Sequence, residues 1–307
     1  MFIINPNEFL LPSFGMTPFR TEYVSLNNEL NNDDYSLSYF NNRFGKNHWS
    51  FTYNGREAIA LALKYYKLEK DDVVTILTTS NNFYISSCVT LEIDVVCTWN
   101  REIVPETKVI FVNHEFGYPY QDMDYLASLG IPIIEDCCTT FFSQDIHNKI
   151  GSYGDFTVYS LPKFFPLQIG GVITSSKIDI SSFTSKCKVE EIQYITNVMS
   201  SQLKQTESII VKRKNNFDYA VQLFETIGFS QRFVNTLEIV PYALLLNNNG
   251  LIKNLTSFKN YIYAHGIQNS IFYGEDAFFI PNHQNLATSE IDYFFEVIKF
   301  YIENKNE

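Results

Sequence analysis

One lysine stands alone in an apolar stretch, Val158–Ile173, which reads VYSLPKFFPLQIGGVI. Lys163 lies between a proline and two phenylalanines, and the next charged residue along the chain is Lys177. Burial lowers the pKa of a lysine amine, and an unprotonated amine can react with a carbonyl compound. The alternative for this stretch taken alone is a lysine whose stem packs on Phe164 while its amine reaches water.

Two other positions have residue types that could bind a ligand. Asn54 is a suitable N-cap for the helix predicted over 54–68, and Gly55 at its start would let a ligand approach the backbone. Free amides at a helix start bind anions, although an ordinary capped helix explains the same residues. Asp136 follows a strand predicted over 131–134 and is either a buried acid at the strand end or the acid of the next turn.

The elements that must position these residues alternate along the first half of the chain. Apolar runs predict strands at 72–77, 95–98, 108–113 and 131–134, with helices at 84–91 and 122–129. This order predicts a mostly parallel sheet with both faces covered. Polar side chains follow the strand ends, at 78–82, His114, Asp136 and Lys163, and should converge at the carboxyl edge where such sheets bind ligands.

The second half of the chain has a different pattern. A largely helical stretch over 189–224 precedes a strand at 240–246 and helices at 257–265 and 289–302. We therefore predict a large domain over 1–207 and a smaller α+β domain over 208–307. Residues 1–50 are predicted to be an irregular arm that wraps the body or contacts a partner subunit.

Composition excludes some classes of function. The net charge of the 307 residues is -11 and no block of basic residues occurs, which argues against nucleic acid as the main partner. The N-terminus lacks the pattern of a signal peptide, and no apolar window is long enough to span a membrane. The five cysteines form no CxxC pair and are expected to be free thiols in a reducing compartment, so we expect a cytoplasmic protein without a metal site.

Seven short motifs then follow one another in an informative order. They are NGREAI at Asn54, HEFGYPYQDMD at His114, IPIIEDCC at Ile131, GSYGDF at Gly151, SLPKFFPLQIGG at Ser160, KRKNNFDYAVQLF at Lys212 and FFIPNHQNL at Phe278. From about Tyr53 to the C-terminus, this series resembles the DegT/DnrJ/EryC1/StrS family of pyridoxal-phosphate-dependent sugar aminotransferases. The resemblance implies the three-layer α/β fold of aminotransferase fold type I, with a mostly parallel central sheet.

The resemblance also implies roles for particular residues. Lys163 would hold pyridoxal 5'-phosphate (PLP) and move protons, and Asp136 would face the pyridine nitrogen. The phosphate would be bound by Gly55, Arg56 and Ser160. Thr139 stands where the family often has a glutamine or histidine near the phenolic oxygen, and either Phe83 or Asn82 would stack on the ring. His114 is expected to be structural, and Cys137 and Cys138 to pack.

The activity implied is transfer of an amino group from an amino acid, expected to be L-glutamate, to a nucleotide-linked keto-deoxysugar. The product would be used for a surface polysaccharide or a glycosylated metabolite. The enzyme would be a homodimer in which Arg213 or Asn216 reaches the partner's cofactor.

Two alternatives remain open at this point. One is dehydration of a keto-deoxysugar, although family dehydratases carry histidine in place of the lysine. The other is a degenerate member serving as a binding or structural subunit. The short chain and the lack of a clear stacking aromatic favour this second alternative, and the retention of Asp136, Ser160 and Lys163 opposes it.

Overall fold

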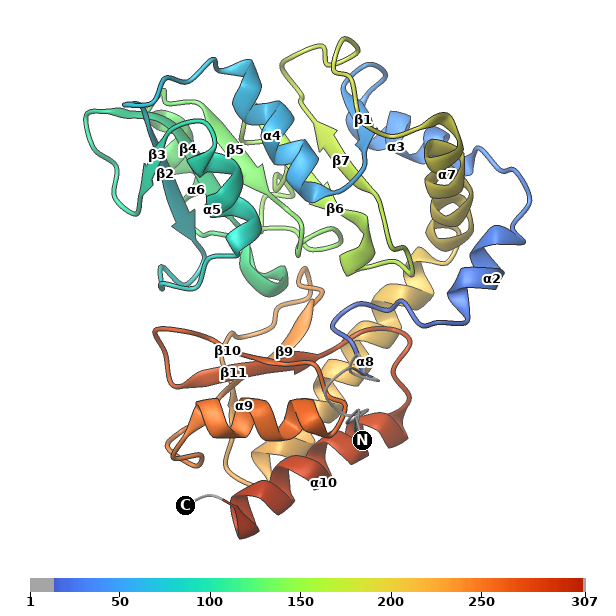
Figure 1. Cartoon of the computed structure of the whole chain (residues 1–307), viewed down its shortest axis with the longest axis vertical. Helices are drawn as coiled ribbons and strands as arrows, with labels where there is room; N and C mark the ends of the chain where they lie inside the picture. The colour runs from blue at the N-terminus through green and yellow to red at the C-terminus, as the bar shows by residue number, and fades with distance from the viewer. Residues whose placement is uncertain (1–13, 306–307) are drawn as a thin grey trace, which may run out of the picture.

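The computed structural model describes residues 14–305, which form two sheets with helices around them (Figure 1). The larger sheet has seven strands in the order β1-β7-β6-β5-β4-β2-β3. Their bounds are β1 (Trp49–Thr52), β2 (Val73–Thr78), β3 (Thr98–Asn100), β4 (Thr107–Asn113), β5 (Ile133–Asp136), β6 (Phe156–Ser160) and β7 (Gly171–Thr174). Strands β2 to β6 are parallel, and β7 and β1 complete the sheet in antiparallel pairs, which confirms the predicted mostly parallel sheet.

Helices cover both faces of this sheet and so produce three layers. Helices α4 (Gly55–Tyr65) and α5 (Ser87–Asp94) pack on one face, where Ile59 and Ile93 share a buried cluster with Phe111. Helices α3 (Tyr35–Phe44), α6 (Met123–Ser128) and α7 (Val189–Leu203) pack on the other face, where Phe40 and Val198 share a second cluster with strand residues. The central strands β2 and β4 are mostly apolar because both of their faces are buried, whereas the edge strand β3 is largely exposed.

The predicted irregular arm at 1–50 is wrong for the part that the structure describes. Helices α2 (Tyr23–Asn28) and α3 occur there, followed by β1, whereas residues 1–13 lie outside the described residues. The asparagines of α3 have low helix propensity, but Phe40 is fully buried against the core and Ser36 hydrogen-bonds to Ser200 of α7. Tertiary packing therefore decides the helix against the local preference.

The smaller sheet is antiparallel, in the order β10-β11-β9-β8. Its strands are β8 (Ser230–Gln231), β9 (Ala243–Asn247), β10 (Ser270–Ile271) and β11 (Ala277–Pro281), and its helices are α8 (Thr206–Glu225), α9 (Leu255–Ala264) and α10 (Thr288–Asn304). Leu244 and Phe278 face the cluster that these helices bury, whereas Leu245 and Phe279 face the core of the larger sheet. One hydrophobic core thus continues from one sheet to the other.

No described helix has both the length and the apolar character needed to cross a bilayer. All five cysteines are free thiols, as predicted.

Candidate active site

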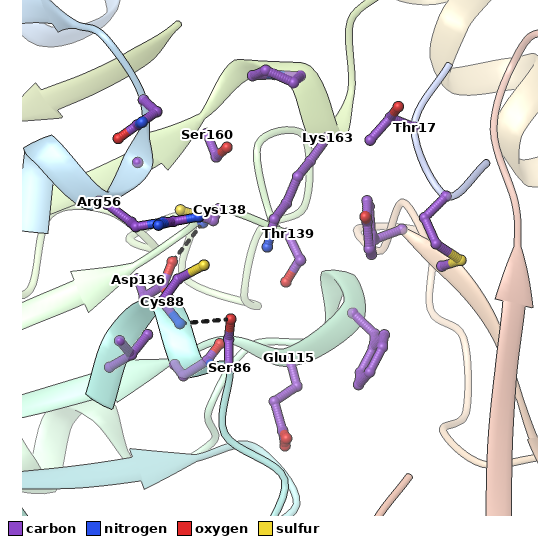
Figure 2. Close-up of a pocket in the computed structure, with 18 of the residues that line it drawn as sticks. Thr17, Arg56, Ser86, Cys88, Glu115, Asp136, Cys138, Thr139, Ser160 and Lys163 are labelled. Carbon is purple, nitrogen blue, oxygen red and sulfur yellow. Dashed lines mark hydrogen bonds between the residues drawn. The ribbon is translucent and has the colours of Figure 1, made fainter. Parts of the chain in front are cut away.

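A cavity of about 590 Å³ lies where the carboxyl ends of β4, β5 and β6 meet the smaller sheet. The larger sheet and its helices contribute Gly55, Arg56, Asp136, Thr139, Ser160 and Lys163, and the smaller sheet and its loops contribute Tyr242, Gln268, Asn269, Ser270 and Phe279. Figure 2 shows Asp136, Ser160 and Lys163 around the same space. Of the strand-end residues that were predicted to converge, Asp136 and Lys163 line this cavity, whereas residues 78–82 and His114 do not.

Lys163 ends a short 3-10 turn, Leu161–Lys163, that directly follows β6. The side chain is half-buried, and its Nζ lies 5.6 Å from the centre of the Tyr242 ring. Burial opposes the charge of the amine, but the acidic groups of Cys138, Tyr242, Asp136 and Tyr84 outweigh this effect and raise the pKa of Lys163 above its usual value. The sequence argument, that apolar neighbours lower this pKa, is wrong because it omitted the acids that the fold brings to the amine.

Asp136 is the last residue of β5 and is buried. Its Oδ1 accepts a hydrogen bond from the Cys138 amide at 2.9 Å, so the acid also stabilises the turn that follows the strand. Burial, together with Asp136, raises the pKa of the Cys138 thiol. Asp136 thus combines both sequence interpretations: it is a turn acid, and it lies at the cavity.

The start of α4 provides free hydrogen-bond donors. Asn54 accepts from the Glu57 amide through its side chain at 3.0 Å and from the Ala58 amide through its carbonyl at 3.3 Å. The preceding amides, of Gly55 and Arg56, therefore come before the first helical bond and point out of the helix end. A Cβ at Gly55 would lie 3.2 Å from both the Cys138 Sγ and the Ser160 Cβ, so a side chain there would crowd this end of the cavity.

The Arg56 side chain is exposed and extends into the cavity toward Cys138 (Figure 2). The Ser160 hydroxyl also faces this end, at 3.7 Å from the position of a Cβ at Gly55. Two amides, a guanidinium and a hydroxyl thus line the same cavity. This donor set suits a phosphate group.

The loop after β2 places a different aromatic residue at the cavity from the one predicted. Phe83 is 83% exposed and does not line the cavity, and neither does Asn82. The Asn82 Oδ1 accepts from the Tyr84 amide at 2.6 Å, and this turn directs Tyr84 to the cavity wall. Tyr84 directly follows Phe83 in the sequence, but only the turn geometry decides which of the two aromatic residues faces inward.

Thr139 lines the cavity as expected, but its hydroxyl is already engaged. It donates to the His114 carbonyl at 2.7 Å. His114 itself is buried: its Nε2 lies 3.3 Å from Glu135 Oε2, and its Nδ1 accepts from the Tyr120 amide. Glu135 also accepts from the amides of Gly151 and Gly154, so this group of buried residues fixes the GSYGD turn on the sheet and His114 is structural.

Arg213 and Asn216 do not extend away from the protomer. Both are buried where α8 packs on the segment 282–286. The Asn216 amide donates to the carbonyls of His283 and Leu286, and Arg213 donates to Asn282 and to the carbonyl of Lys163. The prediction that one of them reaches a partner's cofactor is therefore wrong, because the fold uses both within one chain.

Solved structures with the same fold include three whose chains are covered almost completely. A putative sugar aminotransferase, Spr1654 from Streptococcus pneumoniae, has a TM-score of 0.71 at 18% identity, covering 95% of this chain and 96% of that one. DesV of S. venezuelae has a TM-score of 0.71 at 15% identity, covering 96% and 99%. The E. coli GDP-4-keto-6-deoxy-D-mannose-3-dehydratase with bound hydrated PLP has a TM-score of 0.67 at 15% identity, covering 94% and 100%. These likenesses confirm the predicted fold class.

Residues 38–176, a little under half of the chain, match the DegT/DnrJ/EryC1/StrS aminotransferase family, which is the family that its motifs resemble. The match extends from α3 to just beyond β7 and includes Gly55, Asp136 and Lys163. The matched family is one of aminotransferases, in agreement with the predicted class of enzyme, a PLP-dependent transaminase. Comparison with curated protein sequences found no match.

The residues around the cavity fit this cofactor. A phosphate would meet the free amides of Gly55 and Arg56 and the Ser160 hydroxyl, and an aldehyde carbon would need an amine such as that of Lys163. Asp136 supplies a buried carboxylate on the same wall. The cavity is also large enough for a cofactor and a small substrate together.

Proposed function

We propose that this protein transfers an amino group from an amino acid, L-glutamate, to a nucleotide-linked keto-deoxysugar, for the synthesis of a surface polysaccharide or a glycoside. The observation that carries the proposal is the convergence of Lys163, Asp136 and the donor-rich start of α4 on one cavity. The overall exchange is balanced, because the amino acid becomes a keto acid as the keto sugar becomes an amino sugar.

Each residue has one task in this proposal. Lys163 holds the cofactor through its amine and moves a proton at that amine, while Asp136 holds a proton on the pyridine nitrogen. Gly55, Arg56 and Ser160 bind and orient the phosphate. Bound PLP supplies an electron sink that stabilises negative charge on the substrate carbon. Phe116, Tyr242 and Phe279 form an apolar wall that excludes water from the amine.

The test is an absorbance spectrum of the purified protein with added PLP, compared with Lys163→Ala. In the wild type we expect a visible band, and borohydride reduction should leave PLP covalently bound to the Lys163 peptide. The absence of both in the variant would support Lys163 as the residue that holds PLP. Conversion of the band on adding glutamate, and its return with net amination on adding a keto-deoxysugar nucleotide, would support transamination. Return of the band without amination would favour dehydration instead. A wild type that never links PLP would leave a binding or structural subunit as the explanation.

We also propose that the enzyme is a cytoplasmic homodimer, with its domain boundary near residue 208. Ser185 and the Lys186 amide hydrogen-bond to Glu57 at the start of α4, and the nearby Val189 is 82% exposed. An exposed apolar side chain at the start of α7 would be covered by a second subunit in a dimer. Sedimentation velocity tests this directly, and a monomer at micromolar concentration would refute it.

A further inference from the structure

The side chain of Arg213 is fully buried, and no carboxylate of residues 14–305 is in contact with it. Its Nη2 donates to the carbonyl of Lys163 at 3.1 Å, its Nη1 to the carbonyl of Asn282 at 3.2 Å, and its Nε to Oε1 of Gln284 at 2.8 Å. The guanidinium carbon lies 4.4 Å from the centre of the Phe164 ring. Every contact made by this cation is thus with a neutral group.

Gln284 makes a similar contact with Phe164, the next residue of the same turn. Its Nε2 donates to the carbonyl of Phe164 at 2.8 Å, while its Oε1 accepts from Arg213. Two side chains of the smaller part of the molecule therefore bind the carbonyls of two consecutive residues, Lys163 and Phe164, in the turn after β6. Burying a cation without an acidic partner is unfavourable, so its stabilising effect alone does not account for Arg213.

We propose that Arg213 is a positioning residue for Lys163: its guanidinium fixes the backbone of the lysine turn and so directs the amine into the cavity. The planar fork donates from three separate nitrogens to acceptors on three residues, whereas the donors of a lysine ammonium all lie on one nitrogen. Because Arg213 lies on α8, the direction of the amine depends on how the smaller sheet and its helices pack on the larger one. The inference rests on the proposed function only in taking Lys163 as the reactive lysine.

Asn216 offers a matched control on the same helix. It is also buried, and it donates to the carbonyls of His283 and Leu286 at 3.0 and 3.1 Å, in the segment that Arg213 contacts. It has no hydrogen bond to the lysine turn. A change at Asn216 should therefore loosen the same packing without moving Lys163.

The first experiment uses the protein free of cofactor and follows acetylation of Lys163 by peptide mass spectrometry as a function of pH. Arg213→Met and Arg213→Lys are compared with the wild type and with Asn216→Ala. In both Arg213 variants the amine should leave the acids that raise its pKa, so its acetylation below pH 9 should increase about three- to tenfold, a one-unit fall in pKa giving tenfold. Asn216→Ala should label at the wild-type rate. Equal rates in all four proteins, or the same increase in the Asn216 variant, would overturn the positioning role.

A second measurement uses added PLP and separates this inference from the proposed function. The pH dependence of the visible band should shift in Arg213→Lys but not in Asn216→Ala, and Gln284→Met should show a smaller shift in the same direction. A wild type that links PLP, with an unshifted Arg213→Lys, contradicts only the positioning role. A wild type that never links PLP contradicts the proposed function, while the acetylation rates still decide the role of Arg213.

Discussion

At the scale of single residues, nearby acidic groups change the pKa of Lys163 more than burial does. Lys163 is half-buried among aromatic rings, yet its pKa is raised, because acidic groups on β5, its following turn and the smaller sheet surround the amine. For two bases in the smaller part of the molecule, burial decides the direction of the pKa shift. It lowers the pKa of Arg213 to about 9 and that of His283 to about 3, since neither has a carboxylate partner.

We predict that PLP links to Lys163 faster as the pH rises. The raised pKa leaves the amine mostly protonated near neutral pH, and the reactive fraction grows about tenfold per pH unit below the pKa. Stopped-flow absorbance of PLP binding between pH 6.5 and 8.5 measures this slope. A rate independent of pH over that range would show that proton loss from Lys163 does not limit the linkage.

For Asp136→Asn we predict a loss of transamination of at least about a hundredfold, with PLP still linked to Lys163. The neutral amide can still accept the Cys138 amide bond, but it cannot hold a proton on the pyridine nitrogen. Single-turnover conversion of the visible band with glutamate is the measurement, and circular dichroism checks that the variant folds. Wild-type turnover in this variant would exclude the proposed role of Asp136.

His283 should make folding sensitive to mild acid. Its pKa is lowered by burial and by Arg213 and Arg20, so the unfolded chain takes up a proton at pH 6.5 and below while the folded chain does not until about pH 3. Stability is therefore lost as the pH falls below about 6.5, by about 1 kcal/mol at pH 5.5 relative to pH 7. Urea unfolding at the two pH values should show this loss in the wild type.

The matched variant is His283→Asn. The Nδ1 of His283 accepts from the Asn285 amide at 3.2 Å, and an asparagine oxygen can take a similar position without titrating. The variant should lose less stability between pH 7 and pH 5.5 than the wild type does. An equal loss in both proteins would assign the acid sensitivity to other groups.

At the scale of elements, the start of α4 depends on how closely β7 approaches it. Gly171 in β7 pairs with Thr52, and a Cβ at Gly171 would lie 2.5 Å from the Thr52 Oγ1 and 2.6 Å from the carbonyl carbon of Asn54. Backbone atoms cannot move aside as a flexible side chain can. The glycine therefore sets the place of the N-cap and, with it, the free amides of Gly55 and Arg56.

Gly171→Ala should consequently weaken both folding and PLP binding. We expect a loss of about 2 kcal/mol in the free energy of unfolding, typical of overpacking at a site that cannot relax, and a measurable fall in PLP affinity. Gly15→Ala is the control, because a Cβ there meets its nearest neighbour at an ordinary 3.5 Å. Urea unfolding and PLP titration of the two variants would show whether the close approach matters.

At the scale of the whole molecule, the two sheets share contacts that resist separation. Phe116 and Phe279 pack at 4.8 Å between ring centres, the Tyr242 amide donates to the Phe116 carbonyl at 2.8 Å, and the Tyr118 hydroxyl donates to Asn235. Ser143 also donates to and accepts from Val240. These contacts hold the wall that carries Tyr242 against the larger sheet.

We predict that both sheets unfold in one transition. The two tryptophans, Trp49 and Trp99, lie in β1 and β3 and report only on the larger sheet, whereas amide exchange in α10 reports on the smaller part. The urea midpoints from these two probes should agree, because neither part keeps a complete core without the other. Two separate midpoints would show that the smaller part is stable alone.

The sequence by itself determined the fold class, the helices and strands around the sheet, and the residues at the strand ends, because these depend on local periodicity and on the shared edge of a parallel sheet. Motifs that are contiguous along the chain also predicted Lys163, Asp136 and Gly55 as site residues, and the structure places all three at one cavity. Only the tertiary structure decided that residues 23–44 are largely helical, that Tyr84 and not Phe83 lines the cavity, and that Arg213 contacts the Lys163 turn. It also decided the direction of the Lys163 pKa shift. Each of these depends on contacts between residues that are far apart in the sequence, and local sequence patterns do not predict such contacts.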